Sequence, residues 1–260
     1  AASVELRSLV EAELGRYDAW GESSRAKISA ELVINRYRPF LWAWVLYLLS
    51  ALGGLALYWT GRAAKSRTGR AAVVSGVGLG FTVHVIGICL RMYVSGRPPV
   101  TNMYESMIWV AFGCVAFALV IFVRARQLIL PITAGVLAAI GLVVADAAPT
   151  IMDSSIQPLV PVLRSNAWLT IHVLTITLGY AALALTLGLG SVVLFQFLKP
   201  IVITDQVVAL NHLSYRAMQF GVVLLAAGTI LGGVWADYSW GRFWGWDPKE
   251  VWALIALLGY

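Results

Sequence analysis

The sequence has 260 residues, of which 60% are hydrophobic and 12% charged, with a mean hydropathy of +0.79 and a formal net charge of +6. Soluble globular domains are about half apolar and about a quarter charged. The composition therefore excludes a soluble domain and indicates an integral membrane protein that contacts membrane lipid. Because basic residues in such proteins gather in cytoplasmic loops, the positive charge predicts no nucleic-acid partner.

Residues 1–39 are polar and charged, and they do not begin like a signal peptide, which would start basic and turn apolar. The stretch "VELRSLVEAELGRYDAW" places apolar residues at helical spacing between charges, which predicts a short amphipathic helix. "NRYRPF" then leads into the membrane, with Pro39 at the start of the first span. We expect 1–39 to be an external or juxtamembrane segment and 40–260 to be the transmembrane domain.

The rest of the chain predicts an all-α fold, a polytopic transmembrane helical bundle with six full spans and a partial seventh. The full spans are placed at roughly 40–60, 72–94, 106–123, 128–145, 168–198 and 217–236. A seventh apolar run follows Glu250 and stops at Tyr260. At about 1.5 Å per residue it is too short to cross a hydrocarbon core of about 30 Å. We therefore expect the chain to be a piece of a longer protein.

The two cysteines, Cys89 and Cys114, lie in apolar runs far apart in the sequence, and no CxxC motif is present. We predict that both are buried thiols that pack as small hydrophobic side chains. The chain then carries no dithiol redox motif.

Loop charge predicts the orientation of the spans. "GRAAKSRTGR" has four basic residues and no acidic one, and "RAR" is basic again. The positive-inside rule therefore assigns three segments to the cytoplasm: 61–70, 124–127 and 199–216. Four segments then lie outside, in a periplasm-like compartment: 1–39, 95–105, 146–167 and 237–249.

The external stretch "WADYSWGRFWGWDPKEVW" (235–252), which we call the tryptophan loop, holds five of the eleven tryptophans. An interfacial aromatic belt is one explanation, but a belt places one or two aromatic residues at each helix end. Gly241 and Gly245 let the backbone turn and let a flat molecule approach closely. We therefore predict a binding surface. Its candidate residues are Trp235, Trp240, Arg242, Trp244, Trp246, Asp247 and Lys249.

The sequence "DPKE" within this loop is typical of a helix start. It places Asp247 at the N-cap, Pro248 at the first helical position and Glu250 three residues after the cap. A cap alone explains these three residues. It is also compatible with a functional Asp247, because the cap would hold the tryptophans in place.

The three histidines have different settings. His172, in "AWLTIHVLTITLGY", lies about one turn inside the fifth span, at the depth of the tryptophan loop. It is either a ligand of a bound molecule or a hydrogen-bonding partner of a neighbouring helix. His84 lies near the midplane, seven residues before Arg91, where ionisable residues often have a function but can also join two helices. His212 lies in a polar stretch, where we expect it to be solvated.

The external loop "SGRPPVTNMYES" is stiffened by two prolines and offers three polar side chains, those of Arg97, Asn102 and Glu105. It is either a rigid connector that ends in the cap of the third span or a wall of the tryptophan site.

The predicted ligand is flat, apolar, able to stack on indoles and able to use histidine. It also carries negative groups that Arg242, Lys249 or Arg97 could meet. Heme meets each condition, since its iron binds imidazole and its propionates favour basic partners. A quinone or a lipid headgroup meets most of them but does not use the histidine.

Three stretches resemble one family of heme-handling proteins. "GGVWADYSWGRFWGWDPKEVWALI" is similar to the tryptophan-rich WWD signature, and its "WDPKE" ending resembles the CcsA (ResC) branch of System II cytochrome c biogenesis. System I relatives share the tryptophans but usually lack "PKE". "GRPPVTNMYES" and "WLTIHVLTITLGYAAL" resemble the family's outer loop and its first external histidine segment. "AELVINRYRPF" is similar to the junction of fused CcsB–CcsA proteins, which implies that 1–39 follow a CcsB part.

The resemblance implies that heme b is bound at the outer face and attached to the CxxCH cysteines of apocytochrome c. His172 would be an axial ligand, and Trp240, Trp244, Trp246 and Asp247 would form the WWD platform. The second external ligand is expected after Tyr260, and a CcsB-like part, as a partner or a fused domain, is expected ahead of residues 1–39. The implied chemistry is positional, within a holocytochrome c synthase, because no side chain in these motifs is typical of a general base.

Two alternatives remain at this point. A transmembrane heme exporter or channel would use His84 and Arg91 along its path. A non-catalytic assembly subunit would dock a partner through residues 1–39.

Overall fold

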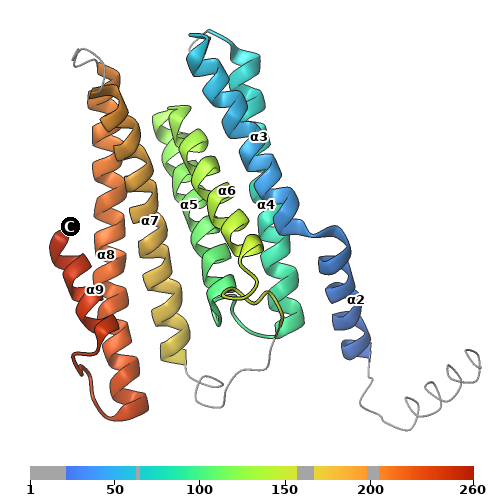
Figure 1. The fold of residues 1–260 in the computed structure, drawn as a ribbon, viewed down its shortest axis with the longest axis vertical. Helices are drawn as coiled ribbons and strands as arrows, with labels where there is room; N and C mark the ends of the chain where they lie inside the picture. Colours follow the sequence, from blue (N-terminus) through green and yellow to red (C-terminus); the bar gives the residue numbers. More distant parts are fainter. Residues whose placement is uncertain (1–21, 63–64, 157–166, 198–204) are drawn as a thin grey trace, which may run out of the picture.

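The computed structural model describes residues 22–62, 65–156, 167–197 and 205–260, and these residues form helices and connecting loops without strands. The amphipathic helix predicted within residues 4–20 lies outside this part of the chain. Figure 1 shows the helices side by side, with α9 against the outer flank of α8. Their bounds are α2 Glu22–Tyr37, α3 Pro39–Trp59, α4 Arg67–Ser95, α5 Met103–Ala125, α6 Ile129–Ala147, α7 Ala167–Phe197, α8 Asp205–Trp240 and α9 Pro248–Gly259.

Six of the described helical segments are long and apolar enough to cross a membrane, which confirms the all-α bundle of six full spans. The first of them runs from Arg25 to Trp59 through a bend at Arg38, whose φ of 44° is left-handed. Arg38 precedes Pro39, and the residue before a proline is disfavoured in the helical region. The chain therefore breaks there, and α2 diverges from the axis of α3 (Figure 1).

Two predictions about these spans are wrong. Helix α8 begins at Asp205, so part of the predicted loop 199–216 is helical. Hydropathy marks only the apolar section of a helix, and no glycine or proline interrupts 205–216. Cys114 is buried as predicted, whereas Cys89 is exposed on the surface of α4, because an apolar run does not specify which helix face packs inward.

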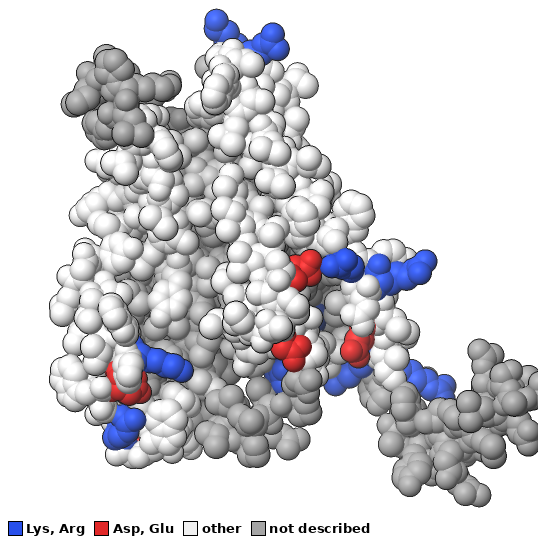
Figure 2. All heavy atoms as spheres, in the orientation of Figure 1, with Lys and Arg blue, Asp and Glu red and all other residues white. Residues whose placement is uncertain are grey.

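The bundle core forms where α5 and α6 lie between the α3–α4 pair and the α7–α8 pair (Figure 1). Its largest fully buried side chains include Tyr47, Ile108, Leu130, Leu142 and Leu185. The connections after α4 and α6 and the tryptophan loop lie at one end of the bundle (Figure 1). Basic side chains without acidic ones cover the opposite end of α3 and α4 on the face in Figure 2.

Helices α7 and α8 approach each other closely through glycines. A Cβ atom on Gly228 would lie 2.7 Å from Ile176 Cβ and 2.8 Å from its Cα. Small residues permit such contact in membrane proteins, where van der Waals packing between helices replaces the hydrophobic drive.

We expect Gly228→Ala to lower the unfolding free energy by about 1–3 kcal/mol, because an added Cβ would overpack a backbone contact that cannot yield easily. Thermal unfolding in detergent would measure the loss. Gly53→Ala is the matched control, since no atom lies within 4 Å of its added Cβ. An equal effect of both substitutions would contradict the proposed packing constraint.

Candidate functional site: a tryptophan-lined cavity beside His172

A cavity of about 430 Å³ lies between α7, α8, α9 and the tryptophan loop. Residues from all four segments line it: His172, Ile176, Thr229, Gly232, Gly233, Trp235, Ala236, Trp240, Trp244, Asp247, Pro248, Lys249, Glu250 and Ala253. Residues predicted to share a site, although far apart in sequence, therefore meet at one cavity.

His172 is half-buried on α7, and its ring is held against α8. Its Nδ1 lies 2.7 Å from the backbone oxygen of Gly228. A carbonyl oxygen only accepts, so Nδ1 carries the proton and donates it, which leaves the lone pair on Nε2. Gly232 makes room for the ring, because a Cβ there would lie 2.7 Å from the imidazole Cε1. The arrangement fixes both the tautomer and the orientation of the imidazole.

The loop's indoles form two edge-on pairs. Trp235 and Trp240, near the end of α8, have ring centroids 4.7 Å apart at 65°. Trp244 and Trp246 have centroids 5.9 Å apart at 87°. Three of these four rings line the cavity, while Trp246 is 69% exposed and reaches the wall only through Trp244.

The predicted helix start at Asp247 is confirmed. Asp247 Oδ1 accepts from the backbone N–H groups of Lys249 and Glu250 at 2.8 and 3.0 Å, and Glu250 Oε2 accepts from Asp247 N–H at 3.2 Å. These reciprocal bonds form a capping box that satisfies donors left open at the start of α9.

The candidate cations differ in position. Arg242 pairs with Glu250 at 3.5 Å and lies over the Trp240 ring at 5.7 Å, so it belongs to the loop and does not line the cavity. Arg97 does not line it either, and Lys249 is the basic side chain that does. The sequence predicted that Arg242, Lys249 or Arg97 could contact negative groups of the ligand. Among the described residues, Lys249 is the one of these three that lines the cavity.

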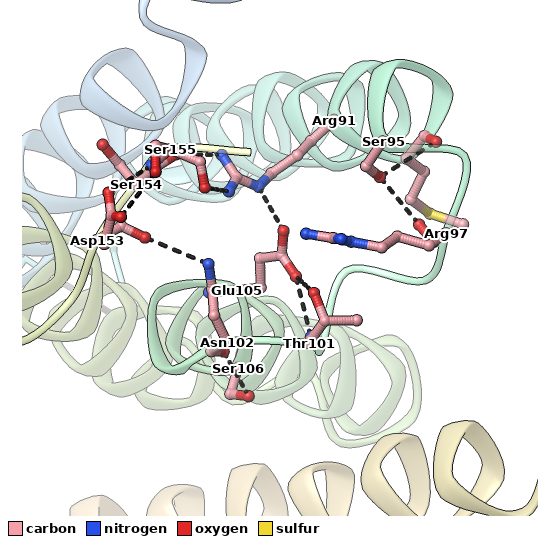
Figure 3. Close-up of polar contacts among 11 residues, drawn as sticks. Arg91, Ser95, Arg97, Thr101, Asn102, Glu105, Ser106, Asp153, Ser154 and Ser155 are labelled. Atoms are coloured by element: carbon pink, nitrogen blue, oxygen red, sulfur yellow. Dashed lines mark hydrogen bonds and ion pairs between the residues drawn. The ribbon is translucent and has the colours of Figure 1, made fainter. Parts of the chain in front are cut away.

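Arg91 and Glu105 form a separate, buried ion pair with an Nε–Oε1 distance of 3.0 Å and side chains 5% and 1% exposed. Figure 3 shows the carboxylate also receiving bonds from Thr101 while Arg91 points to the loop after α6. There the guanidinium donates to the carbonyls of Ser154 and Ser155 at 2.8 and 3.3 Å. Each of the three guanidinium nitrogens of Arg91 therefore donates a hydrogen bond within the protein.

Asn102 caps α5 through a 2.8 Å bond from Glu105 N–H and donates to the Asp153 carbonyl at 3.2 Å. Two hydrogen bonds from Ser155 hold the pKa of the exposed Asp153 carboxyl below its ordinary value. The interpretation of Arg97, Asn102 and Glu105 as a wall of the tryptophan site is wrong, because none of them lines the cavity. The rigid-connector alternative describes this loop, since polar residues in a short loop bond first to the nearest open backbone groups.

His84 is completely buried on α4, and its Nδ1 lies 3.2 Å from the Tyr47 hydroxyl of α3. The rings of Phe40 and Phe112 meet it edge-on, with centroids at 5.8 and 6.3 Å. This is the helix-joining arrangement left open from the sequence, and it does not reach the tryptophan cavity. His212 is exposed on α8, as predicted.

Sequence reasoning missed Gly228, Thr229 and Gly232, which supply the His172 acceptor and part of the wall. The sequence signal for them was the spacing in "GTILGG". Gly228 and Gly232 lie four residues apart and therefore share one helix face. It also assigned Glu250 only to the cap, although this side chain lines the cavity and binds Arg242.

Comparison with known proteins identifies the family. Residues 100–260 match the family described as Cytochrome C assembly protein. The chain belongs to this family. It is 37% identical over 254 residues to Protein NrfI of Wolinella succinogenes, covering 91% of the chain but 26% of NrfI.

Two CcsA proteins are also similar. Cytochrome c biogenesis protein CcsA of Synechococcus sp. (strain WH7803) is 33% identical over 246 residues, covering 79% of the chain and 76% of that protein. CcsA of Prochlorococcus marinus (strain NATL1A) is 33% identical over 214 residues, covering 66% and 65%. The chain is therefore a CcsA-like member of this family with six helices able to span a membrane, and it spans about a quarter of NrfI.

We expect Arg91→Leu to lower the unfolding free energy by about 3–5 kcal/mol, because it strands the buried Glu105 carboxylate. The double variant Arg91→Leu/Glu105→Leu should be more stable than this single variant, since it strands no charge. Thermal unfolding in detergent compares them.

The control is Arg38→Ala, which breaks an ion pair of 3.2 Å to Asp146 whose side chains are 56% and 52% exposed. Such pairs contribute about 0–1 kcal/mol. A loss in Arg38→Ala as large as in Arg91→Leu would refute the distinction between the two networks.

Proposed function

We propose that the chain binds heme in the tryptophan cavity, on the periplasmic side, and presents it for covalent attachment to a CxxCH motif of apocytochrome c. The observation that carries this proposal is His172, whose Nδ1 is hydrogen-bonded to Gly228 while no described residue bonds its Nε2, and which lines one cavity together with three tryptophans. Backbone hydrogen bonding of one ring nitrogen is the usual means of orienting the other toward a metal.

The cavity suits heme as a substrate in three respects. Its volume lies in the range of about 300–1,000 Å³ typical of ligand pockets, without including the open space beyond its mouth. Trp235, Trp240 and Trp244 give aromatic walls for a flat macrocycle. Lys249 gives one cation for a propionate.

The two carboxylates of the cavity are engaged by the fold. Asp247 accepts two backbone N–H groups, and Glu250 accepts two more and pairs with Arg242. Neither is placed as a free base. Thioether formation adds a thiol S–H across a vinyl C=C, with the sulfur bonding one carbon and the proton ending on the other, so it consumes no oxidant. The protein's contribution is then to hold the macrocycle and exclude wrong orientations, which can lower a barrier substantially.

The outer location follows from loop charge. The end that carries the cavity is opposite the end where basic side chains gather without acidic ones (Figure 2). By the positive-inside rule that basic end faces the cytoplasm.

We expect purified wild-type protein to show the absorption spectrum of imidazole-ligated heme, and His172→Gly to lose it. Added imidazole should restore the spectrum, because it can occupy the space left by the side chain. His212→Gly, which removes an exposed histidine far from the cavity, should leave the spectrum unchanged. Equal heme content and spectra in wild type and His172→Gly would disprove His172 as a ligand.

We expect Lys249→Gln to weaken heme binding about two- to fivefold, the size typical of a solvent-accessible ion pair. Titration with heme and with its dimethyl ester tests the cause. Wild type should prefer the free acid, whereas the variant should bind both equally. A preference that survives in Lys249→Gln would show that another group recognises the propionates.

A further inference from the structure

Glu250 makes more contacts than a helix cap requires. A capping box needs only its bond to the Asp247 N–H. In addition, Glu250 Oε2 accepts from Gly245 N–H at 2.7 Å, and Oε1 lies 3.5 Å from Arg242 Nη1. The carboxylate thus contacts three residues of the tryptophan loop, which are Arg242, Gly245 and Asp247.

Two of these contacts, which we call the backbone arm, lie on either side of Trp246. The two N–H groups bound by Oε2 belong to Gly245 and Asp247, the residues on either side of it. Trp246 has a left-handed φ of 57°, which is unfavourable for a bulky residue and persists only where its surroundings impose it. Because its ring meets Trp244 edge-on at 5.9 Å, this backbone geometry also sets a ring of the cavity wall.

The third contact, which we call the arginine arm, connects Glu250 to Trp240 through Arg242. The guanidinium bridges the Glu250 carboxylate and the Trp240 ring, 5.7 Å from its centroid. Gly245 permits this path, since any Cβ there would overlap the guanidinium of Arg242. Trp240 in turn contacts Trp235 at 4.7 Å.

We infer that Glu250 is a positioning residue: through Arg242 and through the backbone around Trp246, its carboxylate sets both indole pairs of the cavity. That these indoles hold heme rests on the proposed function, whereas the placement of the indoles does not. The two arms separate chemically, because backbone N–H groups need only an acceptor but Arg242 needs a negative charge.

Three variants of the purified protein, labelled with 5-fluorotryptophan, distinguish the arms by fluorine NMR, with resonances assigned by single Trp→Phe substitutions. Glu250→Gln keeps an acceptor oxygen but loses the charge, so the Trp240 resonance should shift while Trp246 stays. Arg242→Gln should reproduce that result. Glu250→Ala should shift both resonances. Asp237→Asn, which removes an exposed carboxylate near the end of α8 that does not line the cavity, should shift neither.

Hemin titration of the same variants tests the functional consequence. Glu250→Ala should bind hemin about tenfold more weakly, the size of one lost aromatic contact, with the His172-ligated spectrum retained at saturation. Unchanged Trp240 and Trp246 resonances in Glu250→Ala would overturn the inference. Shifted resonances with unchanged hemin affinity would support the positioning of the indoles by Glu250 and would refute the claim that these indoles hold heme. If wild type binds no hemin, the proposed function fails, and the NMR results alone decide whether Glu250 positions the indoles.

Discussion

The hydrogen bond from His172 to the Gly228 carbonyl is the interaction on which the site depends. It forms where α8 presents Gly228 and Gly232 to α7, so that no side chain of α8 at these two positions separates the helices. Gly228 brings the two backbones together, and Gly232, one turn further on, leaves space for the imidazole. The same close packing that stabilises the helix pair therefore fixes a tautomer. Helix packing and the orientation of the imidazole therefore depend on the same close contact between α7 and α8.

Charge is used in two different ways at this end of the bundle. Arg91 and Glu105 are nearly inaccessible and bond to each other and to the loop after α6, so they hold this end of the bundle together and lie apart from the tryptophan cavity. Around the cavity, Glu250 is also engaged, but its partners lie in the tryptophan loop and its neighbour Lys249 faces the cavity. Burial thus separates a network that joins helices and loops from one that shapes the cavity wall, although both consist of an arginine and a glutamate.

The sequence predicted what local chemistry determines. Hydropathy located six spans, and "DPKE" located the start of α9, because spans and caps depend on residues close in the chain. It also brought His172 and the tryptophans together through depth in the membrane alone. The sequence did not predict which face of each helix packs against its neighbours. The exposed Cys89, the closed loop of Arg97, Asn102 and Glu105, and the inward role of Gly228 depend on which helix face meets which neighbour.

Both carboxylates that line the cavity are bonded to other groups of the protein. Such a site suits a reaction that depends on positioning the reactants and not on a free base. Thiol addition to a vinyl group needs sulfur and carbon held in register more than it needs a base, so rigid indoles are more useful than free acids. Rigidity here has a specific origin. Trp246 adopts a left-handed backbone conformation that is unfavourable for a bulky residue. The backbone N–H groups on either side of it, those of Gly245 and Asp247, both donate to the Glu250 carboxylate. The exposed part of the loop then stays accessible while its backbone is fixed by the start of α9.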